Sequence, residues 1–167
     1  MNIREIKEVD AAAFLVLQKQ IDKETSYMLY EPGERTMTVS EQQKMLQTIH
    51  KASNSAMLGA ESMRKLVAYI GVLGSPLKRK RHVGQIVIGV VAAYHGQGIG
   101  RRLLQEAEIF AKQAGLLRLE LTVMKHNKRA LALYKSVGYQ IEGEKTCSLR
   151  IDGNCVDEWT MAKILSF

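Results

Sequence analysis

The stretch that decides the fold runs from residue 83 to residue 115 and reads VGQIVIGVVAAYHGQGIGRRLLQEAEIFAKQAG. Residues 83–91 are the most β-rich run of the chain and predict a strand. Three glycines follow, at Gly96, Gly98 and Gly100, and residues 101–113 then carry apolar side chains at helical spacing. A strand that ends in glycines and opens a helix leaves backbone N–H groups unpaired at the positive end of a helix dipole. The stretch therefore predicts a strand, a tight turn and a helix, with a turn that suits a phosphate group.

The segments on either side continue the alternation of strands and helices. A helix over residues 11–23 follows a cap at Asp10, and the capping box Ser40-Glu41-Gln42-Gln43 predicts the start of a second helix. Asn127 caps another helix, which Gly138 ends. Strands are expected at residues 2–8, 56–61, 66–73 and 116–124, and in two final runs joined by Asp152-Gly153. This order predicts a single domain over residues 1–167, of the α/β class (α+β, with a mixed sheet).

Charge is distributed unevenly along the chain. The sequence has 24 Lys and Arg against 17 Asp and Glu, which gives a formal net charge of +7. Residues 62–105 contain eight cations and no carboxylate. Such a segment indicates a phosphate-bearing partner, either nucleic acid, an anionic membrane surface or a phosphorylated cofactor, unless it is only an unevenly charged solvated surface. The longest apolar run, residues 86–94, is far shorter than the roughly 20 residues of a membrane helix, so we expect no membrane span.

The two cysteines are Cys147 and Cys155. They form no CxxC pair and have no histidine at ligand spacing, so no metal site is expected. If Asp152-Gly153 is a two-residue hairpin turn, Cys147 faces Glu158 and Cys155 faces Arg150. We therefore expect two free thiols. The first residues mix acids and bases, and residues 11–17 lack a following small-residue cleavage pattern, so we expect no signal peptide and a cytoplasmic protein.

The spacing of the glycines separates three kinds of phosphate-binding loop. The nucleoside-triphosphate loop requires Gly-Lys-Ser or Gly-Lys-Thr, and neither occurs. The dinucleotide fingerprint GxGxxG fails in both registers, because its third glycine would be Arg101 or Leu103. Glu120 does stand about 20 residues further on, where a ribose-binding acid is found, so that interpretation stays open. A tight turn without any ligand is a further alternative.

The remaining pattern, HGQGIG followed by Arg101-Arg102, resembles the GCN5-related N-acetyltransferase (GNAT) family, whose members carry Arg/Gln-x-x-Gly-x-Gly/Ala between the fourth strand and the next helix. Downstream, Asn127-x-x-Ala130-x-x-x-Tyr134-x-x-x-Gly138-Tyr139 is similar to a second signature of that family. The resemblance covers residues 66–139 well. It implies a mixed central sheet of about seven strands flanked by about four helices, and acetyl-CoA as co-substrate.

The resemblance assigns roles to particular residues. It implies that the pyrophosphate of acetyl-CoA binds at the glycine turn, while His95 takes the place of the usual Arg or Gln. A main-chain N–H at the end of the fourth strand would meet the thioester oxygen, and a tyrosine hydroxyl would supply a proton to the departing thiolate. Tyr134 is that tyrosine, although core packing explains it as well, and Asn127 contacts the pantetheine arm unless it is a plain helix cap. The cofactor-binding positions are Val90, Val91, Gln97, Gly98, Gly100, Arg101, Arg102 and Asn127.

The general base is left open by the sequence. Some members use a Glu on the fourth strand, which lies wholly inside the acid-free segment, and others use a Glu where this chain has Thr122. The candidates are Glu120, the acids of the loop between the first two helices, and a water molecule. In the family that loop builds the acceptor groove. The candidate substrate-binding residues are Glu24, Tyr27, Glu31 and Glu34.

Together these features predict an acetyl-CoA-dependent N-acetyltransferase. The acceptor would be a primary amine of a small molecule, an amino acid or a peptide N-terminus, and transfer would be direct because no cysteine lies in the motifs. A nucleic-acid-binding module that uses Lys78 to Arg81 and a non-catalytic coenzyme A sensor are the alternatives. We expect neither a nucleic-acid partner nor a membrane partner, and a homodimer is left open.

Overall fold

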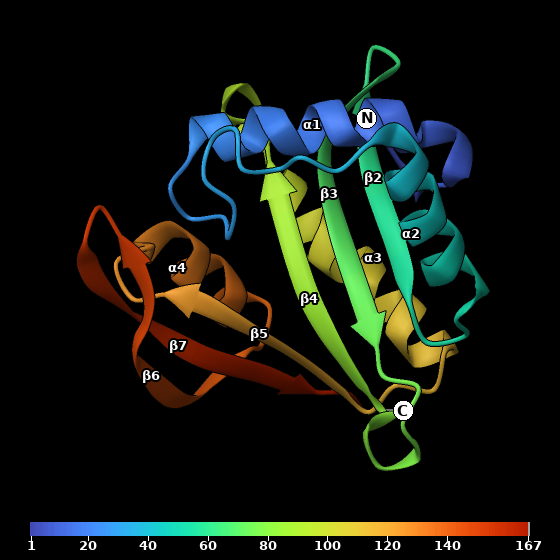
Figure 1. Ribbon diagram of the computed structural model, residues 1–167. Helices are drawn as coiled ribbons and strands as arrows, with labels where there is room; N and C mark the ends of the chain where they lie inside the picture. Colours follow the sequence, from blue (N-terminus) through green and yellow to red (C-terminus); the bar gives the residue numbers. More distant parts are fainter. Residues whose placement is uncertain (167) are drawn as a thin grey trace.

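The seven strands formed within residues 1–166 belong to one mixed sheet with helices on both faces (Figure 1). The computed structural model describes residues 1–166. The strand order is β1-β2-β3-β4-β5-β7-β6, and every neighbouring pair is antiparallel except β4 and β5, which are parallel. The strands are β1 (Asn2–Glu5), β2 (Ala56–Ser62), β3 (Lys65–Gly74), β4 (Val83–Val90), β5 (Arg118–Met124), β6 (Gln140–Ile151) and β7 (Asn154–Ile164). The helices are α1 (Ala11–Glu24), α2 (Val39–Lys51), α3 (Ile99–Gln113) and α4 (Lys128–Ser136).

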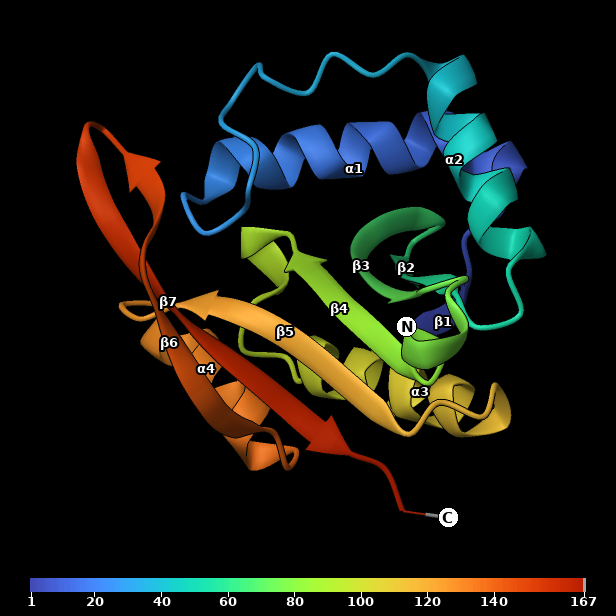
Figure 2. The same ribbon diagram turned by 60° about the horizontal axis from the view of Figure 1, so that its bottom comes forward.

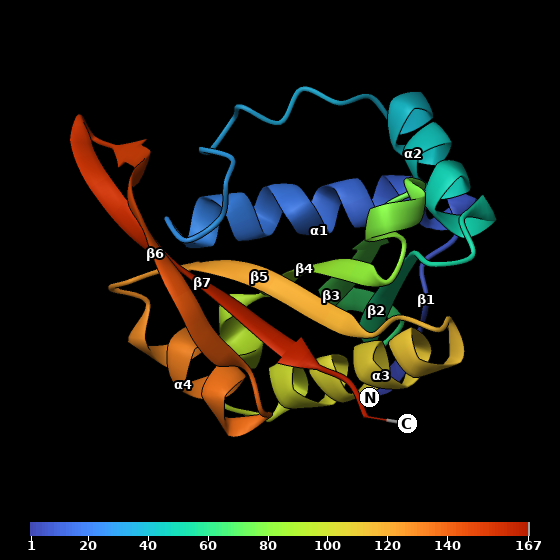
Figure 3. The ribbon, with the colours of Figure 1, turned by 90° about the horizontal axis from the view of Figure 1, so that it is seen from below.

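The two faces of the sheet carry different helix pairs and different cores. Figure 3 shows α1 and α2 on one side of the strands and α3 and α4 on the other. Alternate residues of β3 divide accordingly, since successive side chains of a strand point to opposite faces. Ile70 and Val72 pack into the core that contains Leu103 of α3, whereas Tyr69 packs into the core that contains Phe14 of α1. The predicted mixed sheet and its two helical layers are confirmed.

The second helix begins two residues earlier than the sequence predicts. Thr38, not Ser40, caps α2: its hydroxyl accepts a hydrogen bond from the amide of Glu41 at 3.2 Å. The carboxylate of Glu41 in turn accepts from the amide of Thr38 at 2.7 Å. The prediction of a capping box at Ser40 and Gln43 is therefore wrong, because Thr38 and Glu41 have the same spacing and an ionised acid is the stronger partner.

The prediction of two free thiols is wrong. The structure joins Cys147 and Cys155 in a disulfide, with 4.7 Å between their Cα atoms. Cys155 does face Arg150, as expected, but the register of β6 against β7 shifts between Lys145 and Leu149. Cys147 adopts a φ of 49° in this irregular segment, and its amide donates to Asp157 at 2.7 Å. The bulge turns Cys147 toward Cys155, and regular hairpin pairing could not reveal it.

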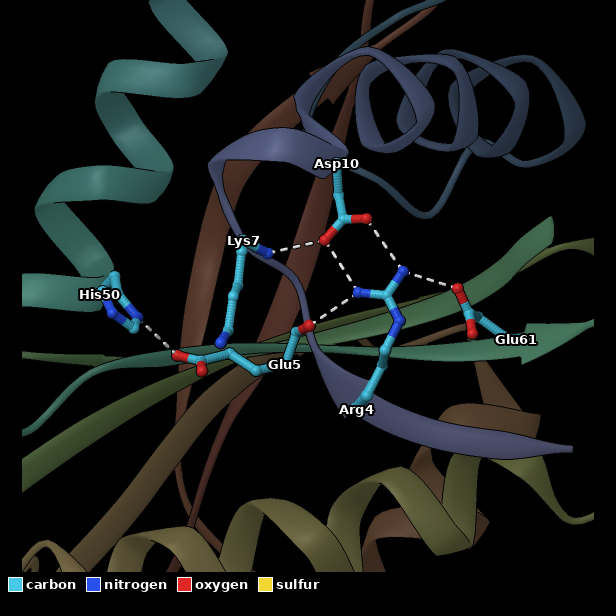
Figure 4. Close-up of polar contacts among 6 residues, drawn as sticks. All are labelled: Arg4, Glu5, Lys7, Asp10, His50 and Glu61. Carbon is cyan, nitrogen blue, oxygen red and sulfur yellow. Dashed lines mark hydrogen bonds and ion pairs between the residues drawn. The ribbon is translucent and has the colours of Figure 1, made fainter. Parts of the chain in front are cut away.

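An ion-pair network fixes the start of α1 against the sheet (Figure 4). The Arg4 guanidinium on β1 binds Asp10 at 2.8 Å and Glu61 of β2 at 2.6 Å. Asp10 stands at the predicted cap of α1, but its carboxylate accepts from Arg4 and from the amide of Lys7, not from the helix. The hydrogen bond from Arg4 lowers the pKa of the Asp10 carboxyl. The network ties β1, β2 and α1 together, so the long axis of α1 is held across the strands.

Candidate active site

The sheet opens between β4 and β5. The two strands pair only through Val83 with Arg118, Gly84 with Leu119 and Gln85 with Glu120. Beyond that point β4 stays paired with β3 as far as Val90, and β5 stays paired with β7 as far as Met124. The facing edges of β4 and β5 therefore diverge without a strand partner, as Figure 2 shows. Unpaired backbone groups on such edges need partners from elsewhere.

The last residues of β4 point their backbone groups into this opening. The amide of Val91 donates to the carbonyl of Val67 at 3.0 Å, so it is used inside the β3–β4 pair. Hydrogen-bonded and non-bonded positions alternate along an antiparallel pair, and the N–H and C=O of Val90 therefore face away from β3, toward β5. The ring of His95 returns to this point, where its Nε2 donates to the Val90 carbonyl at 2.8 Å. Of the two predicted amides, Val90 is the one that faces the opening.

The glycine turn lies directly beyond the end of β4. A short 3-10 turn, Ala92–Tyr94, leads to Gly96 and Gly98, which have φ values of 78° and 77°. A side chain at Gly98 would meet nothing within 4 Å, so the space beside it is open. The first helical hydrogen bond of α3 runs from the Arg102 amide to the Gly98 carbonyl at 3.1 Å. The amides of the three residues before Arg102 therefore have no acceptor within the helix, which is an arrangement that binds anions.

The predicted residues around the turn have distinct contacts. The side chain of Gln97 donates to the Ala93 carbonyl at 3.3 Å, within the turn itself. Gly100 allows α3 to approach α4, because a Cβ there would lie 2.9 Å from Leu133. The guanidinium of Arg101 donates to Ser136 on α4 at 3.0 Å. That of Arg102 reaches the Met1 carbonyl at 3.5 Å, beside β1. Glycine and arginine positions of one short motif thus shape the turn and hold α3 against α4 and β1.

Arg129 is a cation at this turn that the sequence motifs missed. It lies in the first turn of α4, and its Nη2 would be 3.9 Å from a Cβ placed on Gly96. The guanidinium therefore lies next to the glycine turn although 33 residues separate the two positions in the chain. The basic pair Lys128-Arg129 directly after Asn127 was the available signal. The place of Arg129 beside the glycine turn follows only from the packing of α4 beside α3.

Asn127 and Tyr134 occupy the two ends of α4. The Asn127 side chain accepts from the amide of Ala130 at 3.2 Å, so the predicted helix cap is confirmed. Tyr134 is 7% exposed and belongs to the core cluster that includes Ile99 and against which Val90 packs. Burial raises the pKa of its hydroxyl to about 12. The phenol is therefore fully protonated at neutral pH, which a proton or hydrogen-bond donor requires.

The loop between α1 and α2, residues 25–38, covers the opening from the other face of the sheet. At its start, Glu24 accepts a hydrogen bond from the amide of Ala92 at 2.7 Å, just past the end of β4. The ring centroid of Tyr27 lies 5.2 Å from that of His126, which follows β5, and the two ring planes are tilted by 47°. Glu34 accepts from the amide of Glu31 at 2.8 Å in a local turn. Glu24 and Tyr27 thus reach the two sides of the opening, whereas the Glu34 carboxylate is bound to the backbone of Glu31 within the loop.

A buried ion pair that the sequence did not suggest anchors this loop. The Arg35 guanidinium binds Asp22 of α1 at 2.7 Å, and their side chains are only 10% and 2% exposed. The same guanidinium lies 4.2 Å above the ring of Tyr30. Removing one partner of such a pair costs about 3–5 kcal/mol, because a buried charge remains. The loop that carries the candidate acceptor residues is therefore fixed at both ends.

Glu120 and the basic run from Lys78 to Arg81 lie at the opposite end of β4. Glu120 pairs with Gln85 in the sheet and binds Arg118 at 3.0 Å and Lys80 at 3.8 Å. The strand therefore separates Glu120 from the glycine turn, and neither a ribose-binding role nor a base role fits it. Among residues 1–166, no group of three or more His, Cys, Asp or Glu could hold a metal ion. The described helices include none that is long and apolar enough to cross a membrane.

Comparison with known proteins identifies the family. Residues 21–139 match the acetyltransferase (GNAT) family over more than half of the chain. The chain belongs to the GNAT family. The match confirms the predicted family and fold, and the enzyme class of that family is N-acetyltransferase with acetyl-CoA as the acetyl donor.

Relatives with known names support the same conclusion. The chain is 43% identical over 110 residues to the N-alpha-acetyltransferase RimI of Mycobacterium tuberculosis, covering 64% of each chain. It is 34% identical over 88 residues to the L-amino acid N-acetyltransferase AaaT of Escherichia coli, covering 52% of this chain and 54% of the relative. The chain thus matches less than two thirds of the length of these relatives.

Two solved structures share the whole fold. A GNAT-family acetyltransferase from Streptococcus pneumoniae is 29% identical, with a TM-score of 0.95 over 98% of this chain and 99% of that one. The phosphinothricin acetyltransferase of Sinorhizobium meliloti, solved in complex with AcCoA, is 17% identical with a TM-score of 0.86 over 98% of this chain and 88% of that one. The second likeness concerns the fold alone.

Proposed function

We propose that this protein transfers the acetyl group of acetyl-CoA directly to an α-amine, either of an amino acid or of a peptide N-terminus. The observation that carries the proposal is the opening between β4 and β5, which begins at a glycine turn with free amides and is lined by unpaired backbone. An extended chain with amide groups, such as the pantetheine arm of coenzyme A, suits an unpaired strand edge, because it supplies the missing hydrogen-bond partners.

The donor would bind through backbone and cations together. Its pyrophosphate would meet the amides that follow Gly98, with Gln97, Gly100 and Arg101 shaping the turn and Arg129 adding charge. Its thioester oxygen would accept from the Val90 N–H, which faces the opening. The predicted contact of Asn127 with the pantetheine arm and the electrostatic contribution of Arg102 remain part of this proposal. His95, held on the Val90 carbonyl, replaces the Arg or Gln of related proteins.

Tyr134 would act on the sulfur as a hydrogen-bond donor. A thiol has an ordinary pKa of about 8.5, below the value of about 12 to which burial raises the Tyr134 hydroxyl. Complete transfer of the phenolic proton to a solvated thiolate is therefore unfavourable. A thiolate that develops in the same buried surroundings loses hydration too, which raises its own pKa and narrows the difference. The hydroxyl then stabilises the developing charge, and the proton that sulfur finally keeps is replaced from the reacting amine.

The names of the relatives favour an α-amine as the acceptor. RimI is an N-alpha-acetyltransferase and AaaT an L-amino acid N-acetyltransferase. An α-amine has a pKa of about 7.7–8.0, against about 10.4 for a lysine side chain, so a larger share is neutral and nucleophilic at pH 7. We therefore place peptide N-termini and amino acids ahead of other small amines. A single domain over residues 1–167, a cytoplasmic location, the absence of a nucleic-acid partner and a homodimer all remain predictions.

A test combines donor binding with an acceptor panel. Acetyl-CoA at 100 times its dissociation constant should stabilise the fold by about 2.7 kcal/mol, which is visible as a rise in melting temperature. Thiol release should then occur with an alanine-initiated hexapeptide or with free L-amino acids, and less with a peptide whose only amine is a lysine side chain. Stabilisation without release for any amine would favour the coenzyme A sensor. Unchanged melting, together with salt-sensitive binding to DNA or RNA, would favour the nucleic-acid module.

A further inference from the structure

The structure assigns the missing proton acceptor to Glu24, the last residue of α1. We propose that its carboxylate receives the ammonium group of the acceptor and takes the proton that must leave before the amine can attack. This inference rests on the proposed acetyl transfer, which the sequence left without a base.

The position of the Glu24 carboxylate is defined by β4. Its Oε2 accepts a hydrogen bond from the Ala92 amide at 2.7 Å, and Ala92 is two residues beyond Val90. Two residues of extended chain span at most about 7 Å. The Glu24 carboxylate is therefore held beside the strand end at which the Val90 amide would bind the thioester carbonyl. An amine between the two would contact both the base and the carbon that it attacks.

The Glu24 carboxylate also forms no ion pair within the described residues. Its Oε1 accepts from the side-chain amide of Gln20 at 2.9 Å, so both hydrogen bonds that Glu24 receives come from neutral groups. Each oxygen keeps a free lone pair, and the full charge is available to an incoming ammonium.

The other acids of this region are engaged elsewhere. Asp22 is 2% exposed at its side chain and is bound to Arg35. Glu34 closes a turn on the amide of Glu31, in the middle of the loop. Glu120 binds two cations at the far end of β4. Among these carboxylates only Glu24 is joined to the strand end where the sheet opens.

The chemistry balances with the groups present. The ammonium of the acceptor gives one proton to Glu24, and the neutral nitrogen forms a bond to the thioester carbon. The carbon–sulfur bond then breaks as the tetrahedral intermediate collapses, with Tyr134 donating a hydrogen bond to the sulfur. The nitrogen then loses its second proton and the departing sulfur gains one proton, so that coenzyme A leaves as the neutral thiol and Tyr134 remains a neutral phenol. Glu24 returns its proton to solvent, so the products are the N-acetyl amine, coenzyme A and one proton.

A turnover experiment separates a base from a structural residue. Glu24→Gln keeps an oxygen that can accept from Ala92, so the fold and the rise in melting temperature with acetyl-CoA should be unchanged. With an alanine-initiated hexapeptide, kcat/KM at pH 7 should fall by about 100-fold or more, as expected for loss of a general base. The deficit should shrink markedly at pH 9, where the α-amine is already neutral. Glu106→Gln on α3, which removes an equally exposed charge, should leave kcat/KM unchanged.

Other titratable groups lie near Glu24 and also contribute to the pH profile of kcat/KM. Lys19 and Lys23 line a shallow depression of α1 together with Glu24. Tyr94 and His95 follow Ala92 in the chain, and Tyr27 lies near the start of the loop of residues 25–38. Both enzyme forms retain these groups, so only the difference between their two profiles reports on Glu24. A deficit of equal size at pH 7 and pH 9, or no deficit, would overturn the assignment.

A binding measurement tests the ammonium contact without turnover. In the presence of coenzyme A, the alanine-initiated hexapeptide should bind Glu24→Gln at least 10-fold more weakly than wild type by calorimetry, whereas its N-acetylated form should bind both equally. Equal affinity of the unblocked peptide for both forms, or no binding to wild type, would contradict a receptor role. Loss of the melting shift with acetyl-CoA in wild type would instead contradict the proposed function itself.

Discussion

The two ends of β4 carry similar positive charge but different structure. At the end where β4 starts, Lys80 binds Glu120, Arg81 binds Ser53, and β4 pairs with β5. At the end where β4 finishes, the strands separate, the first amides of α3 lack acceptors within the helix, and Arg129 of α4 lies beside the glycine turn. At the closed end two of the four consecutive cations, Lys80 and Arg81, thus have partners in or beside the sheet, while the open end has unused backbone. An anion site depends on unpaired donors more than on the number of cations.

The largest effect is expected from the buried hydroxyl behind the open end. Tyr134→Phe should reduce kcat by about 100-fold or more while the melting shift with acetyl-CoA persists. Because burial raises the Tyr134 pKa to about 12, wild-type activity should show no fall from ionisation of this group below about pH 10. Tyr139→Phe is the matched control, since Tyr139 lies in the same core with an unpartnered buried hydroxyl. Equal turnover of both variants would show that Tyr134 is only a packing residue.

The next test compares two glycines with the same backbone conformation at the two ends of α3. Gly98 and Gly115 have φ values of 77° and 73°, and at both a Cβ would meet nothing within 4 Å. Alanine at either should destabilise the fold by about 1–2 kcal/mol through backbone strain. Only Gly98→Ala should also weaken acetyl-CoA binding, by about 10-fold in calorimetry. Equal weakening by Gly115→Ala would show that the loss follows stability and not the site.

A smaller effect is expected from single cations at each end of β4. Arg129→Ala should raise the dissociation constant of acetyl-CoA about 3-fold to 10-fold at low salt, with a smaller loss at high salt because screening weakens the contact. Arg79→Ala, in the basic run at the closed end, removes the same charge and should change the constant by less than 2-fold. A larger rise of the dissociation constant for Arg79→Ala than for Arg129→Ala would place the phosphates of acetyl-CoA at the basic run.

The smallest effect is expected from Glu120→Gln. This change removes partners of Arg118 and Lys80 at the closed end, where the Glu120 side chain is 31% exposed, and should cost about 0–1 kcal/mol in denaturant unfolding. Because the residue is far from the opening along β4, kcat/KM should be unchanged. A large loss of kcat/KM would return Glu120 to the list of possible bases.

The sequence predicts those parts of the site best that depend only on residues close together in the chain. The glycine turn and the Asn127 cap are encoded within a few residues each, and both lie where the sequence placed them. Contacts between distant segments could not be predicted in this way. Arg129 meets Gly96 only through the packing of α3 beside α4, and Glu24 meets Ala92 only because α1 crosses the end of β4.

Irregular backbone limits prediction for a different reason. The bulge at Cys147 breaks the strict alternation on which the hairpin argument depends, so a register shift of two residues turns two separated thiols into a disulfide. The capping box of α2 was placed two residues late because two overlapping patterns satisfy the same spacing rule. In both cases the sequence predicts the correct strand or helix, but the residues that form the contact depend on the three-dimensional structure.

Amide hydrogen exchange with and without acetyl-CoA tests the central claim most directly, because it compares both ends of β4 in one experiment. Acetyl-CoA is expected to protect the backbone amides of residues 88–102, which include the end of β4 and the first turn of α3. Exchange in residues 78–82 should be unchanged. Protection of residues 78–82, or no protection at the glycine turn under saturating acetyl-CoA, would contradict the account.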